Sequence, residues 1–234
     1  MSAHPVLLLP GMMLDRRMYG GQLTALAGAP AIVGDLTRGE SIETLATQVL
    51  AEAPPRFALV GMSMGGIVAL EIWRRARERV THLALLDTTP HPDKPQRREL
   101  RMEQIAKVET GKLRDVLVES MKPLYLARRN RTSRRLLQSI VDQAVGLGPD
   151  VFRRQSLALR DRPDSVATLA TIDCPALVLC GREDALCPVE WHVAMADAMP
   201  RADLVVLAEC GHLSTMEEPA AVTAALGRLL RRRS

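Results

Sequence analysis

Six short apolar segments recur along the chain, and most are apolar throughout rather than alternating between apolar and polar residues. Uninterrupted apolar runs of this length suit strands that are buried on both faces, as in a parallel sheet. Four longer segments between or after these runs repeat their apolar residues at helical spacing. The alternation predicts an α/β fold with right-handed crossovers. The expected strands are residues 6–9, 32–33, 57–60, 83–86, 176–179 and 204–207, and the expected helices are residues 41–52, 64–77, 188–199 and 219–230.

A long stretch without a clear strand separates the fourth apolar run from the fifth, and prolines lie near both of its ends. Its pattern predicts helices at about 94–110, 112–120, 131–145 and 149–160. A structureless loop of this length would be unusual inside a compact domain. We therefore expect a core formed by residues 1–89 and 166–234, with residues 90–165 inserted as a helical lid, called the lid segment below.

Length and composition place the chain among ordinary globular proteins. Its 234 residues predict one domain, and 47% hydrophobic with 25% charged residues excludes disordered and collagen-like chains. The longest apolar stretch, residues 57–70, is shorter than the roughly 20 residues of a membrane-spanning helix, and the N-terminus lacks the basic region of a signal peptide. The four Cys form no C-x-x-C pair, the spacing that would indicate zinc. We expect a cytoplasmic protein with free thiols, no membrane partner, and neither metal nor cofactor.

The net charge of +4 is unevenly distributed along the chain. Residues 94–162 hold 17 Lys and Arg against 8 Asp and Glu, whereas the remainder is acidic. A basic surface can attract nucleic acid or anionic substrates. Aromatic residues for base stacking are nearly absent from this segment and no nucleic-acid motif occurs, so we expect no nucleic-acid partner. Two interpretations stay open, a solvated cationic helical surface and a basic rim that attracts anionic substrates.

The strongest chemical signal is the segment Gly61-Met62-Ser63-Met64-Gly65, a G-x-S-x-G motif. It directly follows the expected strand 57–60 and directly precedes an expected helix. In a nucleophile elbow, a sharp strand-to-helix turn lifts the serine above the sheet, and the flanking glycines avoid side-chain clashes. The alternative is an ordinary glycine-rich turn with a structural serine.

A serine nucleophile needs a base, and the base needs a carboxylate that fixes its tautomer. His212 lies just beyond the apolar run 204–207, and Asp184 lies just beyond 176–179. Both therefore sit at the carboxyl ends of expected parallel strands, where open α/β sheets place their sites. Asp87, after the fourth run, is a rival acid, whereas we expect His192 to be a solvated helix residue. The predicted catalytic set is Ser63, Asp184 and His212.

With these motifs, the sequence resembles the α/β-hydrolase family, in the branch of small lidded esterases and enol-lactonases, over nearly the whole chain. Residues 9–12, Leu-Pro-Gly-Met, are similar to the oxyanion strand end of that family, and residues 61–66 to its elbow. Residues 181–188 fit the acid loop G-x-x-D-x-x-x-P, and residues 211–219 fit the histidine loop G-H-x-x-x-x-E-x-P. The chain begins at what would be the third strand of the family. The resemblance therefore implies a mostly parallel six-stranded sheet with helices on both faces and a helical lid.

The resemblance also implies an oxyanion hole made by the backbone N–H groups of Met12 and Met64. Pro10 replaces the histidine that commonly precedes the glycine in this family, which removes a side-chain contact but leaves the backbone donor in place. Methionines at these positions suggest a flexible apolar pocket wall. The further candidates for the substrate pocket are Met13, His91, Met121 and Tyr125, although Met13 could serve only in packing. Cys187 and Cys210 fall in the acid and histidine loops, where they are either inert buried thiols or a redox-sensitive pair.

Together these features predict a serine hydrolase that cleaves a small ester, lactone or thioester through an acyl-enzyme. An acyltransferase and a C–C bond hydrolase would use the same three residues. From another class, a ligand-binding receptor or scaffold could keep this fold without turnover. The sequence leaves the natural substrate and the oligomeric state open.

Overall fold

The six expected strands form one parallel sheet in the computed structural model, which describes residues 5–26, 30–121 and 124–233. The strand order is β2-β1-β3-β4-β5-β6, which confirms the α/β fold with six strands. Most strands extend beyond the apolar runs by one to three residues because their flanking residues also pair. The strands are β1 (Val6–Leu9), β2 (Ala31–Val33), β3 (Phe57–Met62), β4 (Val80–Leu86), β5 (Ala176–Gly181) and β6 (Ala202–Leu207).

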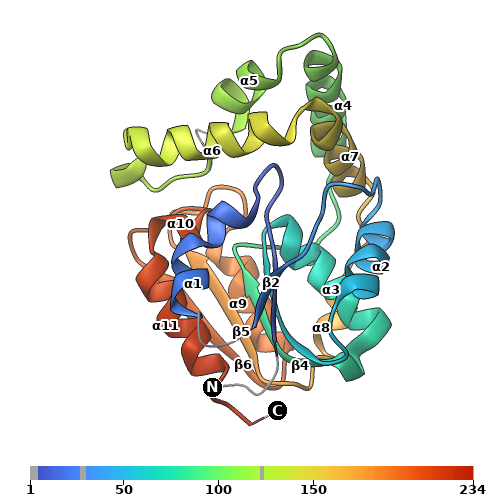
Figure 1. The fold of residues 1–234 in the computed structure, drawn as a ribbon, viewed down its shortest axis with the longest axis vertical. Coiled ribbons are helices and arrows are strands. Elements are labelled where there is room, and N and C mark those ends of the chain that lie inside the picture. The colour runs from blue at the N-terminus through green and yellow to red at the C-terminus, as the bar shows by residue number, and fades with distance from the viewer. Residues whose placement is uncertain (1–4, 27–29, 122–123, 234) are drawn as a thin grey trace.

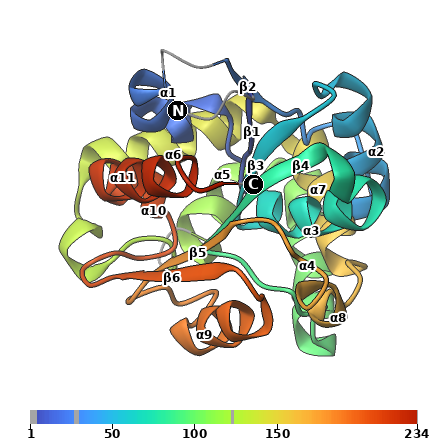
Figure 2. The same ribbon diagram turned by 90° about the horizontal axis from the view of Figure 1, so that it is seen from below.

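Helices cover both faces of the sheet, which explains why the strands are apolar without alternation (Figures 1 and 2). In β1, Val6 and Leu8 join one apolar core, and Leu7 and Leu9 join the other. The first face is covered by α1 (Gly20–Ala25) and α11 (Pro219–Leu229), and the second by α2 (Ile42–Glu52), α3 (Met64–Ala76) and α9 (Val189–Ala198). Ser41 caps the start of α2, and its hydroxyl accepts the backbone N–H of Thr44.

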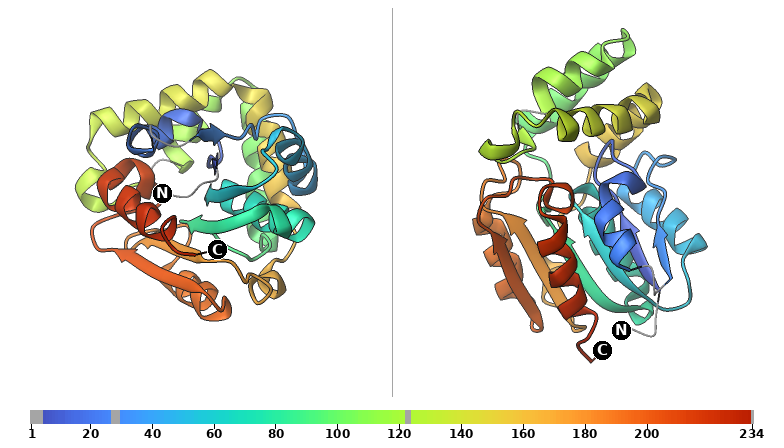
Figure 3. Two further views of the ribbon diagram at one scale, coloured as in Figure 1. Left: turned by 60° about the horizontal axis from the view of Figure 1, so that its bottom comes forward. Right: turned by 60° about the vertical axis from the view of Figure 1, so that its left-hand side comes forward.

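The helices of the lid segment lie beyond the carboxyl ends of the strands, at the opposite end from the two termini (Figures 1 and 3). Helix α4 packs along α7, and the apolar side chains of Ile105, Val108 and Phe152 turn inward. The elements are α4 (Pro95–Glu109), α5 (Leu113–Asp115), a π-helical turn η3 (Val116–Met121), a 3-10 turn η5 (Arg128–Asn130), α6 (Arg134–Leu147) and α7 (Pro149–Arg160). Each expected lid helix thus contains helical structure, and the chain division at residues 90 and 165 stays a prediction.

Several short turns escape the sequence pattern because three to six residues are too few to reveal a helical period. The 3-10 helix η1 is one of them, and it inserts Tyr19 into the core, where the phenol donates a hydrogen bond of 2.7 Å to the Leu9 carbonyl. These elements are η1 (Arg16–Tyr19), α1, the 3-10 turn η2 (Arg77–Arg79), α8 (Val166–Leu169) and α10 (Ser214–Glu217). Within the described ranges, no helix is both long enough and apolar enough to span a bilayer.

Candidate active site

Ser63 occupies a strained turn between β3 and α3. Its φ of 51° lies in the left-handed region that non-glycine residues rarely adopt, which holds the side chain above the sheet edge. Two hydrogen bonds fix the turn: the Ser63 N–H donates to Leu86 at 2.9 Å, and the Thr88 hydroxyl donates to the Ser63 carbonyl at 2.7 Å. A Cβ at Gly61 would collide with the carbonyl of Gly65. The glycines of the motif are therefore required by backbone contact.

Ser63, His212 and Asp184 form one hydrogen-bonded line. The Oγ of Ser63 lies 2.9 Å from Nε2 of His212, and Nδ1 of His212 lies 2.8 Å from Oδ2 of Asp184. The other carboxylate oxygen of Asp184 accepts the backbone N–H groups of Leu186 at 2.8 Å and Cys187 at 2.9 Å. Both the imidazole and the carboxylate are buried. The structure thus brings together the three residues that the sequence predicts as nucleophile, base and acid.

The charge distribution of this line suits a general base. Burial raises the pKa of Asp184, but the attraction of His212 and the hydrogen bonds that the carboxylate accepts outweigh it, so its pKa falls below 3.8. Burial lowers the pKa of His212, but the charge of Asp184 and its hydrogen bond raise this pKa by more. The pKa of His212 therefore lies above the ordinary 6.5. An imidazolium would therefore be stabilised beside Asp184 as it forms.

Asp87, the rival acid, is also buried at the same sheet edge, but it forms hydrogen bonds with Gly181 and with the loop after His212. Its carboxylate accepts the Gly181 N–H at 3.1 Å and both the N–H, at 3.3 Å, and the hydroxyl of Ser214. Burial, reinforced by the Asp184 charge, raises its pKa to about 8. His212 hydrogen-bonds Asp184 rather than Asp87.

The expectation that His192 is solvated is wrong. Its side chain is fully buried beneath the site, where Nε2 accepts the Thr88 N–H at 3.1 Å and Nδ1 lies 3.1 Å from the Pro188 carbonyl. Because an N–H points at Nε2, the ring is the neutral tautomer with its proton on Nδ1. Burial lowers the pKa of His192, which favours this neutral form. The residue supports the loop after β4, and no helical periodicity could have revealed that role.

Glu217 joins the histidine loop to the lid segment. One of its carboxylate oxygens accepts the Gly211 N–H at 2.9 Å, and the other accepts the Ala127 N–H at 2.8 Å and the Asn130 side chain at 2.9 Å. The backbone N–H of His212 donates to Tyr125 at 2.8 Å. The glutamate of the G-H-x-x-x-x-E-x-P segment thus fixes the loop that carries His212 relative to the lid segment.

The loop after β1 carries Met12, the first predicted oxyanion donor, and is held by α7. The backbone N–H of Met13 donates to the side-chain carbonyl of Gln155 at 2.8 Å, and the Gln155 amide donates to Leu36 at 3.0 Å. The second predicted donor belongs to Met64, the first residue of α3, whose N–H has no acceptor within the helix. The role of Gln155, a buried polar residue of the lid, has no signal in the sequence.

Met13 does not line the pocket as expected. Its side chain is buried in the apolar core, because the positive φ of 56° and the Gln155 contact turn this residue inward. The packing alternative therefore describes Met13, whereas Met12 lines a cavity that also contains Ser63.

The cavity at Ser63 has two chambers, and Ser63 and His212 line both of them. The larger, about 600 Å³, is lined by His91 and Cys187, and the smaller, about 70 Å³, by Met121 and Tyr125. Tyr125 stacks on the His212 ring with 6.0 Å between centroids, and burial raises the pKa of its phenol to about 12. His91 lies edge-on to Trp191 at 5.3 Å. Three of the four predicted pocket residues, His91, Met121 and Tyr125, thus line the cavity that contains Ser63.

Cys187 and Cys210 are free, buried thiols. Burial, followed by the charge of Asp184, raises the pKa of Cys187 well above its ordinary value, and burial likewise raises the pKa of Cys210. A protonated thiol is a poor nucleophile and a poor metal ligand. Although Asp184, Cys187 and His212 offer ligand atoms within 4.8 Å of one another, the carboxylate and imidazole are already hydrogen-bonded to each other.

Comparison with known proteins identifies relatives of this chain. Residues 6–226 match the family model described as the alpha/beta hydrolase family. The chain belongs to this family. The hydrolase is 30% identical over 184 residues to a pimeloyl-[acyl-carrier protein] methyl ester esterase of Nitrosomonas europaea, a match that covers 74% of this chain and 71% of the relative.

Solved structures extend the same result. A thermophilic esterase from Thermogutta terrifontis, solved with malate bound, has a TM-score of 0.89 and 30% sequence identity, and the match covers 98% of this hydrolase and 90% of that chain. An enol-lactonase from Burkholderia xenovorans has a TM-score of 0.85 at 22% identity, covering 98% and 92%, and so shows the shared fold. This protein is therefore an enzyme of the hydrolase class.

Proposed function

We propose that this hydrolase cleaves a small carboxylic ester, lactone or thioester through an acyl-enzyme on Ser63. The observation that carries the proposal is the continuous hydrogen-bonded line from Ser63 through His212 to Asp184, at the junction of two chambers. A serine hydroxyl is a weak nucleophile at neutral pH, and this arrangement supplies the base and the carboxylate that it needs.

The reaction follows from the positions of these groups. His212 Nε2 takes the proton from Ser63 Oγ as that oxygen bonds to the substrate carbonyl carbon. The carbonyl oxygen becomes an oxyanion, which accepts hydrogen bonds from the backbone N–H groups of Met12 and Met64. When the tetrahedral intermediate collapses, His212 returns the proton to the leaving alcohol or thiol. Water then attacks the acyl-enzyme by the same steps, which release the acid and restore Ser63.

The test combines covalent labelling with turnover. The wild-type enzyme should react with a fluorophosphonate at Ser63, located by peptide mass spectrometry, and should hydrolyse short-chain p-nitrophenyl esters and thioesters. Ser63→Ala should fold normally by circular dichroism, fail to label, and lose nearly all turnover because the attacking oxygen is gone. A variant that keeps more than about a tenth of the wild-type kcat would refute the assignment. Adding an alcohol acceptor and measuring the transfer product distinguishes hydrolysis from acyl transfer.

A further inference from the structure

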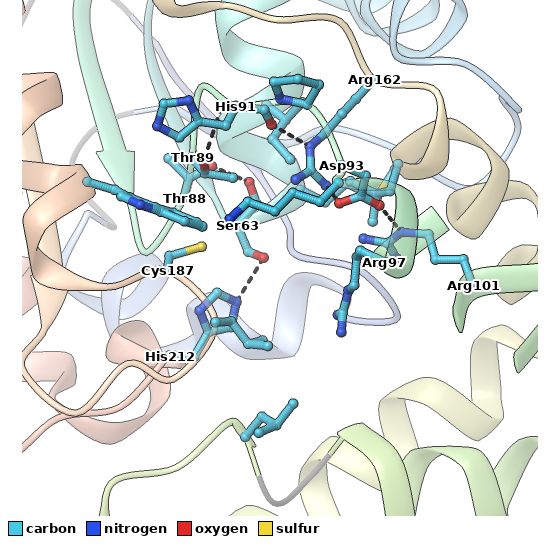
Figure 4. Close-up of a pocket in the computed structure, with 18 of the residues that line it drawn as sticks. Ser63, Thr88, Thr89, His91, Asp93, Arg97, Arg101, Arg162, Cys187 and His212 are labelled. Carbon is cyan, nitrogen blue, oxygen red and sulfur yellow. Dashed lines mark hydrogen bonds and ion pairs between the residues drawn. The ribbon is translucent and has the colours of Figure 1, made fainter. Parts of the chain in front are cut away.

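The larger chamber has a cationic wall built around one buried carboxylate. Asp93 accepts a hydrogen bond from Nε of Arg101 at 2.5 Å, and Nη1 of Arg162 lies 2.6 Å from its other oxygen (Figure 4). The three side chains are only 3%, 7% and 10% exposed. Arg162 is further fixed by donating to the His91 carbonyl at 2.8 Å. One negative charge thus holds two guanidinium groups in place, and this buried group carries an excess positive charge.

Two further cations line the same chamber without a carboxylate partner. Neither Arg97 nor Lys94 forms a side-chain ion pair with any acidic residue that the structure describes. Burial, opposed by the attraction of Asp93 and reinforced by the neighbouring charges of Arg97 and Arg162, lowers the pKa of Arg101 to about 10. Four cations therefore line this chamber beside one carboxylate: the side chains of Arg101 and Arg162 are nearly buried, Arg97 is partly buried, and Lys94 is exposed. Positive charge that is partly removed from water favours binding of an anion.

Many basic residues of the lid segment lie outside the cavity and are exposed to solvent. Arg98, next to Arg97 on α4, points to the surface and pairs with Asp161 at 2.7 Å, and Arg153 pairs with Glu40 at 2.5 Å. These exposed pairs are the solvated cationic surface that the charge distribution suggests. Arg101 and Arg162 are instead largely removed from solvent, and with Arg97 and Lys94 they line the chamber that also contains Ser63 and His212.

Apolar side chains connect the cationic wall to the nucleophile. Leu159 and Leu186 line both chambers, and Arg97 and Arg101 border both as well. An extended ligand between the Ser63 oxygen and Arg97 would therefore pass along leucine side chains, which suit methylene groups rather than a polar linker.

We propose that the substrate carries a second carboxylate, separated from the scissile carbonyl by an aliphatic spacer, and that Arg97 binds this carboxylate with Lys94 beside it. This proposal rests on the ester hydrolysis proposed above. The guanidinium of Arg97 offers parallel N–H donors to the two oxygens of a carboxylate, and Lys94 adds a second positive charge. Asp93 binds both Arg101 and Arg162 and so keeps them oriented, while the wall as a whole stays positively charged.

The test compares monomethyl esters of aliphatic dicarboxylic acids of four to eight carbons with methyl esters of monocarboxylic acids of equal length. The wild-type enzyme should have the higher kcat/KM for the anionic series. Arg97→Gln should lower the preference, the ratio of the two kcat/KM values, about 10- to 100-fold, the usual effect of losing a charge-assisted hydrogen bond. Arg98→Gln is the matched control, because it removes one charge from the same helix outside the cavity, and should leave the ratio unchanged.

The outcomes separate the two proposals. A wild-type enzyme that hydrolyses neutral esters at least as well, with a ratio that Arg97→Gln does not change, would overturn the carboxylate site and leave the ester hydrolysis standing. If neither series is hydrolysed, the proposed function fails. The carboxylate site is then tested alone by titrating adipate into Ser63→Ala in a calorimeter. Saturable binding that the added Arg97→Gln change removes would support the site, and no binding would refute it.

Discussion

The assignment of the acid is tested most sharply by Asp184→Asn. In the wild-type enzyme, one oxygen of Asp184 accepts two backbone N–H groups and the other faces Nδ1 of His212. An asparagine at this position keeps its carbonyl oxygen on the two backbone donors, because its NH2 group cannot accept them. The NH2 then points at Nδ1 of His212, which must become an acceptor. The ring proton moves to Nε2, and a protonated Nε2 can no longer accept the proton of Ser63.

The size of the effect follows from that tautomer change. The variant keeps its volume and its backbone hydrogen bonds, so the loss should fall on kcat, by roughly 10³–10⁴-fold. The assay is steady-state hydrolysis of a p-nitrophenyl ester between pH 5 and 9, with folding checked by thermal unfolding. In the wild-type enzyme, kcat/KM should decrease below an apparent pKa above 6.5, because the neutral form of His212 is the base and Asp184 raises its pKa. In Asp184→Asn, the residual activity should lose that upward shift.

Asp87→Asn is the matched control, since this carboxyl is buried at the same sheet edge. With a pKa of about 8 it is mostly protonated at pH 7, and an asparagine resembles that neutral, hydrogen-donating form. We expect less than about a tenfold change in kcat and a stability loss of about 1–3 kcal/mol from the altered Gly181 and Ser214 contacts. A larger loss of kcat in Asp87→Asn than in Asp184→Asn would refute the reasoning.

Two further changes test the contacts between the lid and the site. Gln155→Leu should lower kcat about tenfold with little change in KM, because the loop that carries Met13 loses its acceptor and the neighbouring oxyanion donor shifts, whereas Gln155→Glu should restore part of kcat. Glu217→Gln retains one carbonyl acceptor but must lose at least one N–H partner, so the melting temperature should fall by about 2–4 °C for each 1 kcal/mol lost. An unchanged kcat in Gln155→Leu, or an unchanged melting temperature in Glu217→Gln, would contradict these roles.

The strands and the elbow could be predicted from the sequence because their physical causes are local. Strands buried on both faces must be apolar throughout, and the turn at Ser63 requires glycine wherever another backbone segment approaches it closely. The order of serine, acid and histidine also follows from the chain, since each residue comes directly after an apolar run. Parallel strands bring their carboxyl ends to one edge, so the sequence alone predicts that His212 lies near Ser63.

Which side chains meet at that edge was decided only by the tertiary structure. Asp87 and Asp184 follow the neighbouring strands β4 and β5, and strand order alone places both near His212. Arg97 and Arg98 are adjacent arginines that the sequence does not distinguish. Their side chains diverge by about 100° around α4. The packing of α4 on α7 therefore decides that Arg97 lines the cavity and that Arg98 pairs with Asp161. The contact between Gln155 and the loop after β1 joins residues 142 positions apart. The sequence determined which elements form and which chemistry they carry, because those depend on neighbours in the chain. Orientation, charge pairing and support within the site depend on how distant segments pack, and therefore belong to the folded molecule.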